Sequence, residues 1–206
     1  MHIEGKMKKQ LVYIIAITAF ISGSCSYSKK FSREFFRENE TMLNSLQHRY
    51  REHYKERPFS IEIKDRDFQQ VSLEILTDTV RYIYSFYLDD PALVDTLRKY
   101  RFNISFMEKL IEDMRTTHCT WLTHLEYYEN LKKQQLVFLS IRHRRLESFL
   151  KKDKYFTLAF FQYNQPFDER GRLLDRANKK VLRKINGAVF FKMTDSVAYA
   201  ISSDFR

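Results

Sequence analysis

Residues 59–87 read FSIEIKDRDFQQVSLEILTDTVRYIYSFY, and this stretch decides the fold class. Apolar and polar side chains alternate along three runs, FSIEIK, FQQVSLEIL and VRYIYSFY, and a period of two residues is typical of β-strands. Polar segments at 65–67 and 77–79 separate the runs and suit tight turns. The stretch therefore predicts a three-stranded antiparallel meander.

Helical patterns flank this meander on both sides. Residues 33–56 place apolar side chains three and four positions apart and stop before Pro58, which predicts a first helix. Asp90 followed by Pro91 combines a helix cap with a first-turn proline, and it predicts a second helix over residues 91–100.

The rest of the chain mixes helix and strand patterns. An apolar stripe over residues 106–128 predicts a longer third helix, although four threonines within it are poor helix formers and could mark a break. The remaining elements are predicted as strands at 135–143 and 155–163, a helix at 172–186 and a terminal hairpin at 188–203 that turns at Asp195. Strand 155–163 is apolar on both faces, which suits either a doubly covered central strand or a partner surface.

No repeat, linker or low-complexity stretch divides residues 33–206. We expect one α+β domain here, in which an antiparallel sheet packs against long amphipathic helices.

The first residues have the three-part layout of a secretory signal. Two lysines precede an apolar run of eleven residues at 11–21, and small residues follow it up to Cys25. As a helix the run would rise about 16 Å, half of a bilayer's hydrocarbon core, so a permanent membrane span is not expected.

The small residues that end in Cys25 resemble the lipobox of bacterial lipoproteins, in the relaxed form of Bacteroidota. The resemblance implies a cleaved signal peptide over residues 1–24, with Met7 as an alternative start, and a lipid on Cys25 as the new N-terminus. Residues 25–32 would then tether the lipid to the domain. Because Ser26 and not aspartate follows the cysteine, the resemblance implies the periplasmic face of the outer membrane.

Composition excludes several enzyme classes. The four glycines, Gly5, Gly23, Gly171 and Gly187, cannot form a dinucleotide-binding motif, a P-loop or a hydrolase nucleophile elbow. We expect no cofactor.

Histidines and cysteines give no metal or catalytic pattern. In helices, His48 and His53 would lie about 140° apart and His118 and His124 about 120° apart, so neither pair shares a face, and no metal site is expected. Cys119 is the only thiol left after cleavage, which excludes a disulfide. We interpret it as a small buried apolar residue, with a thiol nucleophile beside His118 as the alternative. No residue is assigned a catalytic role.

Positive charge is concentrated between Lys132 and Lys192. Sixteen lysines and arginines oppose five acidic residues there, a local net charge of +11. On an exported protein this predicts contact with anionic phospholipid, lipopolysaccharide phosphates or acidic glycans, and no nucleic acid is expected. A solvated basic face without a ligand is the alternative. The candidate anion-binding residues are Arg142, Arg144, Arg145, Arg172, Arg176, Lys179, Lys180, Arg183 and Lys184.

We therefore expect a lipid-anchored cell-envelope protein with a binding or structural role, held to the membrane by its anchor. Two alternatives stay open, a periplasmic enzyme of unknown reaction and a subunit that docks into an envelope complex through its aromatic strands.

Overall fold

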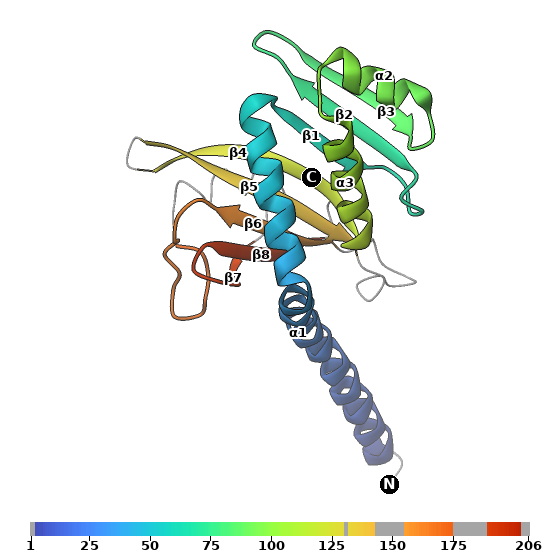
Figure 1. Cartoon of the computed structure of the whole chain (residues 1–206). Helices are drawn as coiled ribbons and strands as arrows, with labels where there is room; N and C mark the ends of the chain where they lie inside the picture. Colours follow the sequence, from blue (N-terminus) through green and yellow to red (C-terminus); the bar gives the residue numbers. More distant parts are fainter. Residues whose placement is uncertain (1–2, 130–131, 143–154, 175–188, 203–206) are drawn as a thin grey trace. The chain divides into compact units, whose positions relative to one another are not determined.

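The structure is a computed structural model that describes residues 3–129, 132–142, 155–174 and 189–202 (Figure 1). The side chains of residues 3–29, 127–129 and 132–133 are not part of this description. The described elements are α1 (Ile3–Glu56), β1 (Phe59–Ile63), β2 (Gln70–Leu76), β3 (Arg81–Tyr87), α2 (Pro91–Lys99), α3 (Ile104–Thr116), β4 (Cys119–Glu129), β5 (Lys132–Arg142), β6 (Tyr155–Phe161), β7 (Phe191–Lys192) and β8 (Val197–Ser202).

The chain divides into two compact units. The first unit is Met1–Glu38, whose described part is helix alone. The second unit, Asn39–Arg206, holds the end of α1 and all the other described elements.

All eight described strands belong to one antiparallel sheet with the order β3-β2-β1-β4-β5-β6-β8-β7. The predicted meander is confirmed, because β1 pairs with β2 and β2 pairs with β3. Helices α2 and α3 then carry the chain past the meander, so that β4 pairs with β1 and not with β3. The α+β class with an antiparallel sheet is therefore correct, and β3 is left at the end of the sheet.

One face of the sheet is covered by helices (Figure 1). The ring of Tyr50, from the last turns of α1, lies edge-on to Phe59 of β1 at 4.9 Å between centroids, and its hydroxyl donates to the Phe59 carbonyl. Phe102, between α2 and α3, meets the same ring at 5.4 Å. Leu43 and Leu46 of α1 are also fully buried, so this face holds the main core.

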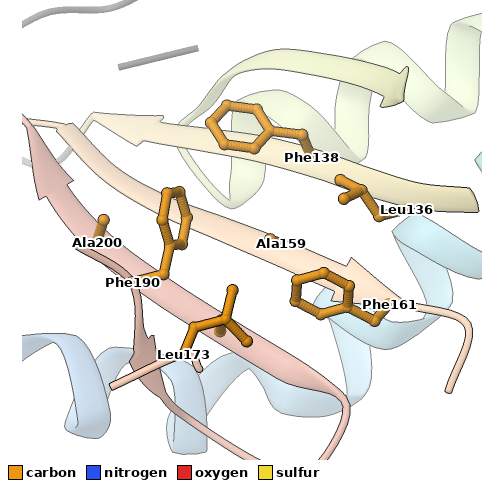
Figure 2. Packing of buried hydrophobic residues seen from close by; sticks show 8 residues of the cluster. Leu136, Phe138, Ala159, Phe161, Leu173, Phe190 and Ala200 are labelled. Atoms are coloured by element: carbon orange, nitrogen blue, oxygen red, sulfur yellow. The ribbon is translucent and has the colours of Figure 1, made fainter. Parts of the chain in front are cut away.

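The opposite face carries a second core over strands β5, β6 and β8 (Figure 2). Phe138 and Phe161 project from the strands, and Leu173 and Phe190 from the following segments cover them. Strand β6 is therefore buried on both faces, which confirms the central-strand interpretation for residues 155–161. Tyr163, beyond the end of the strand, is exposed.

The second helix begins as its sequence predicts. The carboxylate of Asp90 accepts a hydrogen bond from the backbone N–H of Ala92 at 2.8 Å, and Pro91 occupies the first turn. Leu93 and Leu97 are the buried residues of α2.

The prediction of one helix over residues 106–128 is wrong in its second half. Helix α3 ends at Thr116, His118 takes a left-handed φ of 53°, and Cys119 opens strand β4. β-Branched threonines favour a pleated strand, and residues 121–126 alternate between the two faces of the sheet. Part of the apolar stripe at helical spacing therefore belongs to strand β4. The expectation of long helices is not confirmed for α2 and α3.

Two other boundaries differ from prediction. α1 begins at Ile3 and includes residues 25–32, which were expected as a lipidated N-terminus and tether. Arg172 and Leu173, expected to open a helix, instead form single antiparallel bridges with Phe191 and Phe167. The rest of that predicted helix, 175–186, lies outside the described residues. The terminal hairpin of β7 and β8 is confirmed.

Candidate functional site

The free edge of β3 is the candidate site. Two hydrogen bonds at the ends of this strand determine which of its residues bond to β2. They run from the Thr77 N–H to the Val80 carbonyl and from the Leu88 N–H to the Gln69 carbonyl. Since backbone direction alternates in an antiparallel pair, residues 82, 84 and 86 bond to β2. Residues 81, 83, 85 and 87 therefore point their N–H and C=O groups away from β2, and no described strand pairs with them. The Tyr87 carbonyl already accepts a hydrogen bond from the Asp90 N–H at 3.1 Å, so the open part of the edge is residues 81–85 and the Tyr87 N–H.

Large apolar side chains accompany this open backbone edge. Ile83 is 65% exposed, Tyr87 57% and Val80 45%. Natural edge strands are commonly protected by charges, proline or short length. β3 has seven residues, no proline and one charge, Arg81, which pairs with Glu74 of β2 at 3.0 Å. At the other end of the sheet, β7 has only two residues and includes Lys192, so that edge is protected.

A ladder of aromatic rings stiffens β3 on its helix-facing side. Tyr82, Tyr84 and Phe86 lie side by side, with centroids 6.4 and 6.0 Å apart. Tyr100, which caps the end of α2, packs across the ladder, and its hydroxyl lies 2.7 Å from that of Tyr84. The hydrogen bond with Tyr84 raises the pKa of Tyr100 to about 12. The ring ladder therefore supports β3 on the helix-facing side of the sheet, while the outer edge of the strand has no described strand partner.

The predicted basic surface falls mostly outside the described residues. Arg142 ends β5, where its backbone N–H donates to the His118 carbonyl at 2.9 Å. Arg172 is exposed, and its N–H donates to the Asp168 carboxylate at 2.7 Å. The other seven candidates are not described: Arg144, Arg145, Arg176, Lys179, Lys180, Arg183 and Lys184.

Cys25 lies within the backbone of α1, and its side chain is outside the description. Among the described residues, no helix is long and apolar enough to cross a membrane.

The remaining thiol lies in the core. Cys119 is fully buried and its Sγ–H donates to the Trp121 carbonyl at 3.3 Å. Burial raises the pKa of this thiol to about 12. A nucleophilic cysteine needs the opposite shift.

The histidines have structural contacts on separate elements. His53 stacks on Phe106 of α3 at 3.3 Å, and His124 of β4 stacks on Tyr54 at 4.0 Å. Among the residues described with side chains, no group of three or more His, Cys, Asp or Glu could hold a metal ion.

Sequence reasoning did not single out the β3 edge. A signal was present, because five of the seven residues of RYIYSFY are apolar or aromatic and they fall on both faces of the strand. This composition is typical of a central strand that is covered on both faces. The position of β3 at the edge follows only from the order of strands in the sheet.

No family model, curated protein or solved structure matches this chain.

Proposed function

We propose that the chain is a lipid-anchored cell-envelope protein that binds another protein by accepting a strand at the β3 edge. The observation that carries the proposal is an open backbone edge flanked by Ile83 and Tyr87, each more than half exposed. In strand addition the main-chain hydrogen bonds supply affinity, and alternate side chains supply specificity.

Two features of β3 support this binding mode. Its outward N–H and C=O groups have no described strand partner. The ring ladder, closed by the hydroxyl contact between Tyr84 and Tyr100, holds the strand in position before a partner arrives. Preorganisation of this kind lowers the entropic cost of binding.

A photocrosslinking amino acid at position 83 tests the docking proposal. It would be introduced into the full chain in the cells that naturally produce it, and compared with the same probe at Val189, which is 55% exposed and far from β3 in the sequence. We expect a discrete adduct from position 83 and none from position 189. Equal labelling at the two positions, or no adduct at 83, would refute docking at β3.

The anchor rests on the lipobox-like sequence that ends in Cys25. Two or three acyl chains would hold the protein stably at the membrane, since a single chain binds only marginally. We place it at the periplasmic face of the outer membrane. Cells producing the full chain would be fed radiolabelled fatty acid. Wild type should incorporate label and Cys25→Ser should not, and equal incorporation would contradict the anchor.

A second candidate function rests on the charge of +11 between Lys132 and Lys192. We propose that these residues, many of them within segment 172–186, contact anionic lipid or glycan. Each basic residue near an anionic lipid surface contributes about 1 kcal/mol, and the attraction weakens with salt.

The measurement is co-sedimentation of the full chain with anionic and neutral liposomes at two salt concentrations. Wild type is compared with a variant in which Arg176, Lys180 and Arg183 are changed to glutamate. We expect salt-sensitive binding to anionic liposomes that the triple variant loses. Equal sedimentation of the two proteins would assign the segment to a solvated surface.

A further inference from the structure

We infer that the strand accepted at β3 is a short extended segment of another protein, apolar in its centre and with a lysine or arginine at each end. The inference rests on the proposed docking function and specifies the chemistry of the partner. It is carried by the short length of the open edge, the apolar side chains on both faces of β3 and the exposed carboxylates at the two ends of the strand.

The open edge is short. The turn between β2 and β3 closes one end, where the Thr77 N–H bonds to the Val80 carbonyl. The other end closes at Tyr87, whose carbonyl accepts a hydrogen bond from the Asp90 N–H. Residues 81–87 span about 20 Å, at roughly 3.3 Å per residue. A linear segment of about seven extended residues is therefore long enough to cover the edge.

Both faces of β3 are apolar at this edge. Tyr82, at the end of the ring ladder, lies on the helix-facing side and is 38% exposed, and Ile83 points to the opposite face and is 65% exposed. Neighbouring strands place their side chains beside one another on each face of a sheet. A segment with apolar residues on both of its faces would therefore pack against Ile83 on one side and against Tyr82 on the other.

Exposed carboxylates lie at both ends of β3. Asp78 is in the turn directly before the strand, and Asp89 is in the turn directly after it. Neither carboxylate has an ion pair among the described residues. The one charged residue of the strand, Arg81, already pairs with Glu74 at 3.0 Å. A basic residue at each end of the partner would therefore gain a favourable charge contact, whichever direction the partner runs.

The charge at this edge is opposite to that of the whole chain. Residues 77–90 contain one arginine and three aspartates, a net charge of −2, whereas the chain carries +10. At about 0.1 M salt the screening length is about 10 Å, so a bound segment interacts mainly with the charges next to it. The charge of the whole chain by itself would favour an acidic partner. The sign of the preference therefore distinguishes local from overall charge.

Fluorescence anisotropy with labelled peptides tests the inference, using the full chain purified in a neutral detergent. The probe is a seven-residue peptide with lysine at each end and valine, threonine and tyrosine between. A second peptide has glutamate at each end, and a third has lysine at each end and a central proline, which removes a donor that strand pairing needs. The double variant Asp78→Asn/Asp89→Asn is compared with Glu169→Gln, which removes a charge from an exposed residue far from β3 in the sequence.

We expect the lysine-ended peptide to bind about tenfold more tightly than the glutamate-ended one at about 0.1 M salt, because two exposed charge contacts change from attraction to repulsion. The ratio should approach one at about 1 M salt. Asp78→Asn/Asp89→Asn should reduce it to about twofold or less, and Glu169→Gln should leave it unchanged. The proline peptide should bind at least about tenfold more weakly than its parent.

Several outcomes would overturn the inference. These are equal or tighter binding of the glutamate-ended peptide, a preference that survives Asp78→Asn/Asp89→Asn, and a proline peptide that binds as tightly as its parent. If the photoprobe at position 83 yields a discrete adduct while the peptides show no preference for lysine ends, docking at β3 stands and the basic-ended partner is wrong. If the photoprobe yields no adduct and no peptide binds, both proposals fail.

Discussion

Cys119 allows a quantitative test of whether this protein carries a reactive thiol. The side chain is fully buried, and its pKa is raised by burial from 9.0 to about 12. At pH 8 a thiol with a pKa of 9 is about one-tenth ionised, whereas one with a pKa of 12 is ionised in about one molecule in ten thousand. The thiolate that reacts with a disulfide reagent is therefore about a thousandfold scarcer in the folded protein.

The assay follows release of the chromophore from an aromatic disulfide reagent at pH 8. The full chain would carry Cys25→Ser, so that Cys119 is its only cysteine. We expect native labelling to be at least about a thousandfold slower than labelling in strong denaturant, since access also requires the core to open. A native rate within about tenfold of the denatured rate would contradict the buried, protonated assignment and restore the thiol-nucleophile interpretation.

The same pKa shift predicts how stability depends on pH. The folded state holds the Cys119 proton more tightly than the unfolded state, so this contribution is fully present below about pH 9 and is lost as pH rises towards 12. At pH 11 the loss is about 3 kcal/mol, at 1.36 kcal/mol per pH unit. Urea unfolding of Cys25→Ser, compared with Cys25→Ser/Cys119→Ala, should show the steeper decline only where Cys119 is present. Parallel curves would refute the shift.

Three substitutions test the packing that supports the sheet, each by chemical denaturation. Tyr50→Phe removes the hydroxyl that donates to the buried Phe59 carbonyl and should cost about 1–2 kcal/mol, and no change would refute that bond. Leu46→Ala leaves a cavity at a fully buried site and should cost about 2–5 kcal/mol; a cost below about 1 kcal/mol would mean that the site is not in the core. Asp113→Asn weakens a buried carboxylate's ion pairs with Arg49 of α1 and Lys109 at 2.9 Å, and should cost about 1–3 kcal/mol because both cations are partly exposed. Unchanged stability would show that these ion pairs contribute nothing net.

Local sequence signals correctly predicted the parts of the fold that are determined by interactions between residues close together in the sequence. The meander followed from period-two alternation with polar turns, and the second helix followed from Asp90 and Pro91. Both signals act within a few residues, so tertiary packing had little to override.

The error at residues 119–128 has a different origin. Leu122 and Leu125 fall at a spacing that suits a helix face, but in β4 they lie on opposite faces of the sheet, opposite Leu139 and Leu136. Each face has a core of its own, so apolar residues on both sides of the strand are buried. Periodicity cannot distinguish a helix from a strand buried on both faces.

The edge position of β3 could not be predicted, because it depends on which strand of the meander β4 joins. The connection from Leu88 to His118 holds two short helices and brings β4 beside β1, where Leu122 meets Ile61. Nothing in the local sequence of the connection fixes that choice.

In β1 and β3, the two outer strands of the meander, the amino-acid composition does not match the position of the strand in the sheet. β1, with Ser60 and Glu62 among its five residues, has the alternation of a half-exposed strand, yet all five residues are buried. Its polar groups are accommodated by specific contacts, with the Ser60 hydroxyl 2.6 Å from that of Thr123 and Glu62 paired with Lys64 at 2.7 Å. β3 has the composition of an interior strand and lies at the edge.

Such a conflict between local composition and global position is expected where a surface serves a function, because folding alone would favour the reverse arrangement. An edge strand without a partner gains nothing from apolar side chains on its outer face, and it risks aggregation. A second strand beside β3 reduces the conflict, because Ile83 and Tyr87 then pack beside the side chains of that strand and the outward backbone groups of residues 81, 83 and 85 are paired. On this argument the composition of β3 matches an assembled sheet, which supports the proposed docking of a strand at this edge.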